Sequence, residues 1–148
     1  MTLSEINDDL LATFFKHGFR IHPNYIGSDN KIHALKQWPS RAASNMEELG
    51  KLVEEASKSG EVQRFGVVPP EHCMIVDLDV RDGKMGLQNY EDLVKTHGIT
   101  ATPLFQVKSK SGGFHLYFKT ASKFVKTVSN GAKYDGVDIR GQGGFVYA

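Results

Sequence analysis

The stretch "CMIVDLDV", residues 73–80, constrains the fold of this 148-residue chain more than any other. Its apolar residues predict a strand, and side chains along a strand alternate between two faces. Val76 and Leu78 then lie on one face, while Asp77 and Asp79 lie on the other, roughly 7 Å apart at Cα. An ionised carboxylate in apolar surroundings is costly unless it is paired or bound to a metal. The strand is therefore expected to have one apolar face and one face that uses negative charge.

Two later segments repeat this alternation. In "FHLYF" the apolar side chains share one face, and His115 and Tyr117 share the other. In "GVDIR" the apolar face leaves Asp138 and Arg140 opposite. If the three strands are neighbours, one face carries three carboxylates, an imidazole and a guanidinium. Carboxylates this dense repel one another unless divalent cations bind among them, and such a set suits metal-assisted phosphoryl or nucleotidyl transfer.

The pattern along the whole chain predicts an α+β fold. A helix-rich N-terminal half precedes a mostly antiparallel sheet of short strands joined by glycine-rich turns. Asn45 is expected to cap the second helix, and the stretch from Asn24 to Ala43 is expected to be irregular. Apolar spacing predicts helices over residues 4–18, 45–60 and 87–98, the last with Leu87, Tyr90, Leu93 and Val94 facing inward. Strands are expected over residues 19–23, 64–68, 73–80, 104–109, 114–119, 136–140 and 145–148.

Composition indicates a single compact domain in the cytoplasm. Hydrophobic residues make up 40% of the chain and charged residues 24%, which is ordinary for a globular protein. We find no apolar run long enough to span a membrane and no signal peptide. The single cysteine, Cys73, excludes an internal disulfide and is expected to be buried.

The net charge of +1 conceals an asymmetry. Residues 1–103 hold 11 Lys/Arg and 15 Asp/Glu, whereas residues 104–148 hold 7 Lys/Arg and 2 Asp/Glu. A basic C-terminal part is compatible with phosphate-bearing ligands, although solvated loop lysines would give the same count. The candidates to contact such a ligand are the lysines at 108, 110, 119, 123 and 126.

Each motif also has a purely structural interpretation. Asp79 could belong to a solvated turn just past the strand, and His115 could be a structural imidazole. "SGG" could only open a hairpin, and Asp138 could cap a turn. The histidines at 17, 22, 33, 72 and 97 form no spacing typical of a site. The combination of motifs, rather than any one, favours a catalytic site.

In this order and spacing, "IVDLDVRDG", "SGGFHLYF" and "GVDIRGQGGFVYA" resemble the three motifs of bifunctional primase-polymerases. These are members of the archaeo-eukaryotic primase superfamily in phages, plasmids and other mobile elements. The resemblance covers roughly residues 65–148. The N-terminal half departs from the family pattern, because the usual lysine-proline pair is missing, and no role is carried over to Lys31 or Lys36.

The resemblance implies a fold in which an RRM-like sheet, here residues 65–148, packs with an N-terminal α/β unit, here residues 1–64. It also implies template-directed nucleotidyl transfer in a bacterial or archaeal host cell. The expected partners are nucleoside triphosphates, a single-stranded DNA template with a primer, and a helicase domain or protein, with no membrane. Because "GGFVYA" ends within an apolar strand, we expect the chain to be a fragment of a longer protein.

The resemblance also assigns roles to individual residues. Asp77, Asp79 and Asp138 would hold two Mg²⁺ or Mn²⁺ ions and form the catalytic set. The triphosphate would be bound by Ser111, Gly112, Gly113 and His115. To these we add Arg140 as a phosphate contact.

Two other functions compete with this one. "SGGFHLYF" loosely resembles the aromatic strand of an RRM, in which Tyr117 would stack on bases of RNA or single-stranded DNA without catalysis. Alternatively, the carboxylates and His115 could form a metal-dependent phosphohydrolase, with the histidine as a direct metal ligand.

Overall fold

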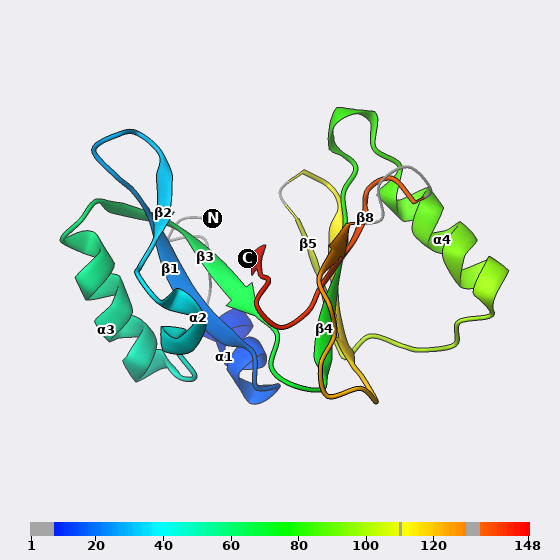
Figure 1. Cartoon of the computed structure of the whole chain (residues 1–148), viewed down its shortest axis with the longest axis horizontal. Helices are drawn as coiled ribbons and strands as arrows, with labels where there is room; N and C mark the ends of the chain where they lie inside the picture. Colours follow the sequence, from blue (N-terminus) through cyan, green and yellow to red (C-terminus); the bar gives the residue numbers. More distant parts are fainter. Residues whose placement is uncertain (1–7, 110, 130–133) are drawn as a thin grey trace. The chain divides into compact units, whose positions relative to one another are not determined.

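The computed structural model describes residues 8–109, 111–129 and 134–148. The chain forms two compact units, one ending at Pro70 and joined by Tyr147 and Ala148, the other spanning Glu71–Val146 (Figure 1). Each unit combines helices with one antiparallel sheet, so the fold is α+β, as predicted. No helix in the described ranges has the length and apolar character needed to cross a membrane.

The first unit is built on a four-stranded sheet in the order β2-β1-β3-β9. Helix α3 packs on β1 and β3, and its N-terminus is capped as predicted: the Asn45 side chain accepts a hydrogen bond from Glu48 N–H at 2.9 Å. The elements are α1 (Asp8–Lys16), β1 (Arg20–Ile26), β2 (Ile32–Ala34), α2 (Trp38–Arg41), α3 (Met46–Ser57), β3 (Glu61–Val68) and β9 (Val146–Tyr147).

The stretch from Asn24 to Ala43 is more regular than its sequence indicates. Strand β1 continues past Pro23 to Ile26, and β2 and the short helix α2 follow it. Proline cannot donate to a ladder, which favours ending a predicted strand there. Pro23 is tolerated because β2 pairs only with Asn24–Ile26, after the proline.

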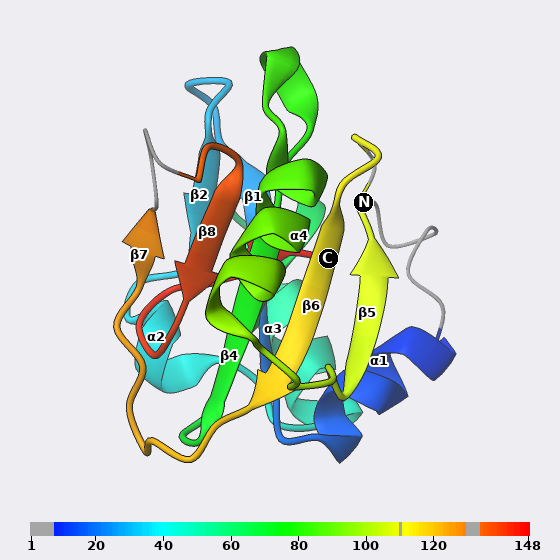
Figure 2. The same cartoon turned by 90° about the vertical axis from the view of Figure 1, so that its right-hand side faces the viewer.

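The second unit is a five-stranded sheet in the order β5-β6-β4-β8-β7, with β4 at its centre (Figure 2). Met74, Val76 and Leu78 of β4 lie on the apolar face, as predicted, and Tyr90 of α4 packs against that face. The elements are β4 (Cys73–Leu78), a 3₁₀ turn (Arg81–Gly83), α4 (Gly86–His97), β5 (Phe105–Lys108), β6 (Phe114–Lys119), β7 (Val128–Ser129) and β8 (Val137–Arg140).

Two predictions about this unit are wrong in detail. Strand β4 ends at Leu78, so Asp79 and Val80 lie beyond it. Leu87 is 39% exposed rather than inward-facing. It lies in the first turn of α4, whereas Tyr90, which packs against the sheet, lies one turn later. Cys73 is buried and unpaired, as predicted.

Candidate active site

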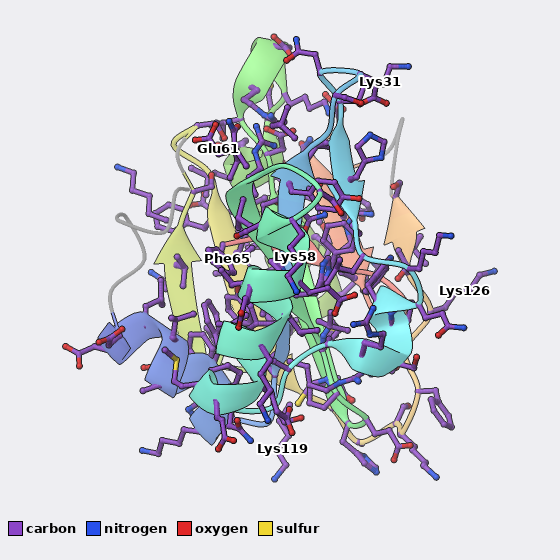
Figure 3. All side chains as sticks on the ribbon, turned by 90° about the vertical axis from the view of Figure 1, so that its left-hand side faces the viewer. Lys31, Lys58, Glu61, Phe65, Lys119 and Lys126 are labelled. Atoms are coloured by element: carbon purple, nitrogen blue, oxygen red, sulfur yellow. The ribbon has the colours of Figure 1, made fainter. Side chains whose placement is uncertain are left out.

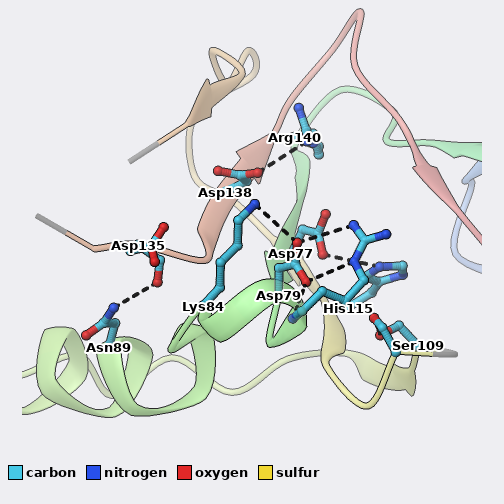
Figure 4. Close-up of polar contacts among 11 residues, drawn as sticks. Asp77, Asp79, Lys84, Asn89, Ser109, His115, Asp135, Asp138 and Arg140 are labelled. Carbon is cyan, nitrogen blue, oxygen red and sulfur yellow. Dashed lines mark hydrogen bonds and ion pairs between the residues drawn. The ribbon is translucent and has the colours of Figure 1, made fainter. Parts of the chain in front are cut away.

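The three strands that carry the motifs are neighbours, and their polar residues face one another. Asp77 on the central strand β4 pairs in register with His115 on β6 and with Asp138 on β8. Since residues opposite one another in adjacent strands project to the same face, these three side chains share one face of the sheet. Figure 4 shows the resulting cluster.

Asp77 and His115 contact each other within this cluster. His115 Nε2 lies 3.3 Å from Asp77 Oδ1, and the two side chains are 9% and 25% exposed. The other ring nitrogen, Nδ1, is buried and has no hydrogen-bond partner among the described residues. A buried polar atom without a partner is costly, so this nitrogen is expected to have a function or a ligand.

Tyr117 lies on the same strand face, and its ring is buried and stacks on Phe105 at 4.4 Å. Burial first, and the negative charge of Asp77 second, raise the pKa of the Tyr117 hydroxyl above its ordinary value. A buried ring cannot serve as a base-stacking platform. The RRM-like alternative therefore loses the residue on which it depended.

Asp79 is held just past the end of β4 by backbone contacts. Its N–H donates to Gly136 O at 2.7 Å, and its carbonyl accepts from Gly86 N–H at 3.0 Å. A Cβ on Gly86 would overlap backbone atoms of both Asp79 and Gly136. Glycine is thus required at Gly86 for the start of α4 to approach Asp79 this closely.

The carboxylate of Asp79 is surrounded by basic groups. It accepts hydrogen bonds from the Arg81 backbone N–H at 2.9 Å, from Arg81 Nε at 3.2 Å and from Lys84 Nζ at 3.4 Å. The Arg81 side chain, above all, lowers the pKa of Asp79 to about 2. The same guanidinium also senses the charge of Asp77, which contributes to the raised pKa of Arg81. Asp79 is thus ionised at any physiological pH.

Sequence reasoning missed Arg81 and Lys84. The signal was present, because both follow directly in "DVRDGK", but no role was assigned to either residue. The turn at Arg81–Gly83 brings both cations back onto Asp79. The solvated-turn interpretation was right about the turn, yet the Asp79 side chain is only 15% exposed.

Asp138 and Arg140 form the third acid–base contact of the site. Arg140 Nη2 lies 3.3 Å from Asp138 Oδ2, and both side chains are partly exposed. Arg140 Nε is buried, and the part of the chain that the structure describes offers it no hydrogen-bond partner. The structure brings both predicted residues into the cluster.

The "SGG" motif forms the turn between β5 and β6. Gly112 has φ +91°, and its N–H donates to Ser109 O at 3.1 Å, so this amide is used within the turn. This turn lies directly against the end of β4, since a Cβ on Gly113 would overlap the Leu78 carbonyl oxygen. Ser109 was not singled out from sequence, yet its hydroxyl lies 3.2 Å from that of Ser111. The predicted contact at Lys110 lies outside the described residues.

The arrangement of the acids bears on metal binding. Within residues 8–109, 111–129 and 134–148, no three His, Cys, Asp or Glu side chains are placed to hold a metal ion. Asp77, Asp79 and Asp138 each contact a basic side chain instead. Their oxygens are nevertheless the donors that Mg²⁺ and Mn²⁺ take, and Asp77 and Asp138 are direct cross-strand neighbours. The donor set therefore fits divalent cations once the basic side chains are displaced.

Comparison with known proteins assigns a family. A model of the N-terminal domain of bifunctional DNA primases/polymerases matches residues 11–148, nearly the whole chain. Neither the curated proteins nor the solved structures give a match. The matched family supports nucleotidyl transfer by a DNA primase/polymerase in DNA replication, in general terms. The chain belongs to the bifunctional DNA primase/polymerase family and corresponds to its N-terminal domain.

Proposed function

We propose that this domain adds nucleotides to the 3′-hydroxyl of a primer on a single-stranded DNA template, with Asp77, Asp79 and Asp138 holding two Mg²⁺ or Mn²⁺ ions. The observation that carries the proposal is the register of Asp77, which lies opposite His115 on one side and Asp138 on the other. In this way all three family motifs contribute to a single cluster.

The bound cations would lower the pKa of the 3′-hydroxyl and neutralise charge on the triphosphate, as in other two-metal sites. The residues of the chain orient the reactants. The 3′ oxygen forms a bond to the α-phosphorus while the bond from that phosphorus to the bridging oxygen breaks. Pyrophosphate leaves, and the hydroxyl proton passes to a carboxylate of the site or to water.

The basic side chains have a second role in this proposal. Arg81, Lys84 and Arg140 neutralise the carboxylates when no cation is bound. A triphosphate with its cations offers them phosphate oxygens, with which Arg makes strong charge-assisted hydrogen bonds. We therefore assign these three residues to the triphosphate, together with His115, Ser111 and the turn at Gly112–Gly113.

Calorimetry tests the binding half of this proposal. dATP, ATP and dAMP are titrated into the protein, each with Mn²⁺ and with EDTA. We expect binding of a triphosphate that requires Mn²⁺, with little binding of the monophosphate. Replacing His115 by Gln should weaken this binding, whereas His97→Gln, on the exposed end of α4, should not. The preferred triphosphate also identifies the sugar that the site accepts.

Primer extension tests the chemical half. A labelled primer on a single-stranded template should lengthen with Mg²⁺ or Mn²⁺ and release pyrophosphate. Release of orthophosphate without extension would instead indicate the phosphohydrolase. A folded sample that binds no triphosphate in the presence of metal would contradict the proposal.

A further inference from the structure

An aromatic side chain lies on the surface of the second unit with no use in the active site. Phe124 is 64% exposed, more than any other large apolar side chain in the described residues. Leaving such a ring in water forgoes about 1.5–3 kcal/mol of burial. A single exposed apolar residue is common, so what matters is how the chain around it is held.

The segment that carries Phe124, Thr120–Thr127, is tied at its start to the loop before β4. Thr120 N–H donates to His72 O at 2.8 Å, and His72 N–H donates to Lys123 O at 2.9 Å. These two bonds fix the backbone immediately before the ring. Figure 2 shows the segment leaving the end of β6 and running to β7 at the edge of the sheet.

The "GQGG" motif fixes the other side of the segment. Val125 N–H donates to Gln142 Oε1 at 2.6 Å, and Gln142 Nε2 donates to Cys73 O at 3.1 Å. Gly141 N–H donates to Thr127 Oγ1 at 3.0 Å, and a Cβ on Gly141 would overlap the Val125 carbonyl oxygen. The backbone on both sides of Phe124 is therefore anchored, and the fold itself holds the ring in solvent.

Lysines precede and follow this ring in the chain. Lys119, Lys123 and Lys126 are exposed, and no acidic residue occurs between Lys119 and Ser129. Lys123 Nζ lies 5.3 Å from the centroid of the Phe124 ring. The pair that Lys123 forms with Glu71 at 3.8 Å is exposed and therefore weak. Figure 3 shows the side chains of Lys119 and Lys126 extending away from the ribbon.

The segment also leads directly to the site. It continues into β7, where Ser129 lies opposite Asp138 on β8. Phe124 precedes Ser129 by five residues, so the chain between them spans at most roughly 18 Å. A flexible polymer that contacts the ring is therefore within reach of Asp138 in the same unit.

We propose that Phe124 is a stacking platform for a base of single-stranded DNA, with Lys119, Lys123 and Lys126 contacting the adjacent phosphates. Aromatic rings flanked by cations bind single strands in this way, because every base has a face to stack and every nucleotide carries a charge. The inference rests on the proposed function, which makes DNA the partner. It adds a surface that guides the single-stranded DNA toward Asp138.

Fluorescence anisotropy with labelled oligo-dT tests this assignment in EDTA, without nucleotide, so that the active site makes no contribution through metal. Phe124→Ala should weaken binding about 5- to 150-fold, the range for loss of one stacked base. Phe124→Leu keeps apolar area but has no aromatic face, so it should weaken oligo-dT binding as well. Phe124→Trp should bind like the unmodified protein. Met85→Ala, at another exposed apolar position in the same unit, is the matched control.

Lys126→Gln should weaken binding and reduce its dependence on salt by about one ion. Equal affinity of Phe124→Ala and the unmodified protein, or no oligo-dT binding by the unmodified protein, would overturn the assignment. So would sedimentation showing that Phe124→Ala turns a dimer into monomers, because a second copy would then cover the ring. Triphosphate binding measured on the same samples reports on the proposed function separately, so the two failures are distinguishable.

Discussion

Each of the two sheets buries one histidine. These two histidines differ in the residue that lies opposite each of them in the neighbouring strand. His22 on β1 pairs with Gly66 on β3, and its ring stacks on Trp38 at 4.4 Å. His115 on β6 pairs with Asp77 on β4, and its ring contacts that carboxylate. The two residues are 1% and 7% exposed, so burial alone does not separate them.

The cross-strand partner does separate them. A Cβ on Gly66 would overlap the His22 ring, so the glycine leaves room for an imidazole that packs as a neutral aromatic group. Burial, above all, lowers the pKa of His22 to about 4. His115 instead lies 3.3 Å from a carboxylate oxygen that shares its face with Asp138. One histidine packs in a core and the other lies in the candidate site, although each lies within a strand.

The largest expected effect comes from removing the carboxylate that distinguishes His115. Asp77→Asn keeps the shape of the side chain but loses its charge and its strength as a cation ligand. We expect nucleotidyl transfer to fall about a thousandfold or more, since a bound cation contributes several kcal/mol to charge stabilisation in the transition state. Primer extension measures the loss.

The control is Glu91→Gln, which removes one exposed negative charge from α4 and should leave extension unchanged. Circular dichroism verifies that Asp77→Asn is folded. Extension at the normal rate by this variant would remove Asp77 from the catalytic set.

The second effect is on stability and belongs to His22. The ordinary histidine pKa is near 6.5, so as the pH falls below this value the unfolded chain takes up the proton first. The stability associated with neutral His22 is thus fully present above pH 6.5 and is lost as the pH falls toward 4. The loss in unfolding free energy is about 3 kcal/mol.

Urea unfolding between pH 4 and pH 7, followed by the fluorescence of the single tryptophan Trp38, measures this loss. His22→Gln should remove this contribution to the dependence of the unfolding free energy on pH, whereas His97→Gln should retain it. A slope that is the same in all three proteins would show that the His22 ring already accepts a proton in the folded state.

Sequence reasoning placed Asp77, His115 and Asp138 on one face of the sheet because the three strands follow a strict alternation. In each strand the apolar residues fix which face is buried, so Asp77, His115 and Asp138 had to project from the opposite one. What the sequence did not state is the order of the strands. The structure supplies it by placing β4 between β6 and β8.

Two features escaped because they depend on residues far away in the chain. Asp79 leaves the strand because its backbone bonds to Gly136, and the alternation of "DLD" carries no sign of this. His22 has the same local pattern as an exposed strand residue, and its contacts with Gly66 and Trp38, which are distant in the chain, help to make it a core residue. Local periodicity predicts faces, whereas contacts across the sheet decide what each face does.

The third prediction compares the two histidines directly. His115→Gln should weaken binding of a triphosphate with Mn²⁺ about 10- to 100-fold, the range for losing a hydrogen bond to a charged group. His22→Gln should leave this affinity unchanged at pH 7, where the protein is folded. Calorimetry on both variants gives the comparison. Equal weakening in both would mean that the effect of His115 is a general loss of structure rather than contact with phosphate.

The smallest effect concerns Asp79 and the guanidinium beside it. The hydrogen bond from Arg81 is the main reason that the pKa of Asp79 is about 2. Arg81→Gln should therefore raise this pKa toward the ordinary value near 3.9, while Lys84, whose contact at 3.4 Å is longer, retains part of the shift. Carboxyl NMR without metal follows the titration, and Arg64→Gln in the first unit is the control. An unchanged pKa would show that the Arg81 backbone N–H and Lys84, rather than the guanidinium, set the charge of Asp79, and the Arg81 side chain would then be free to serve the triphosphate alone.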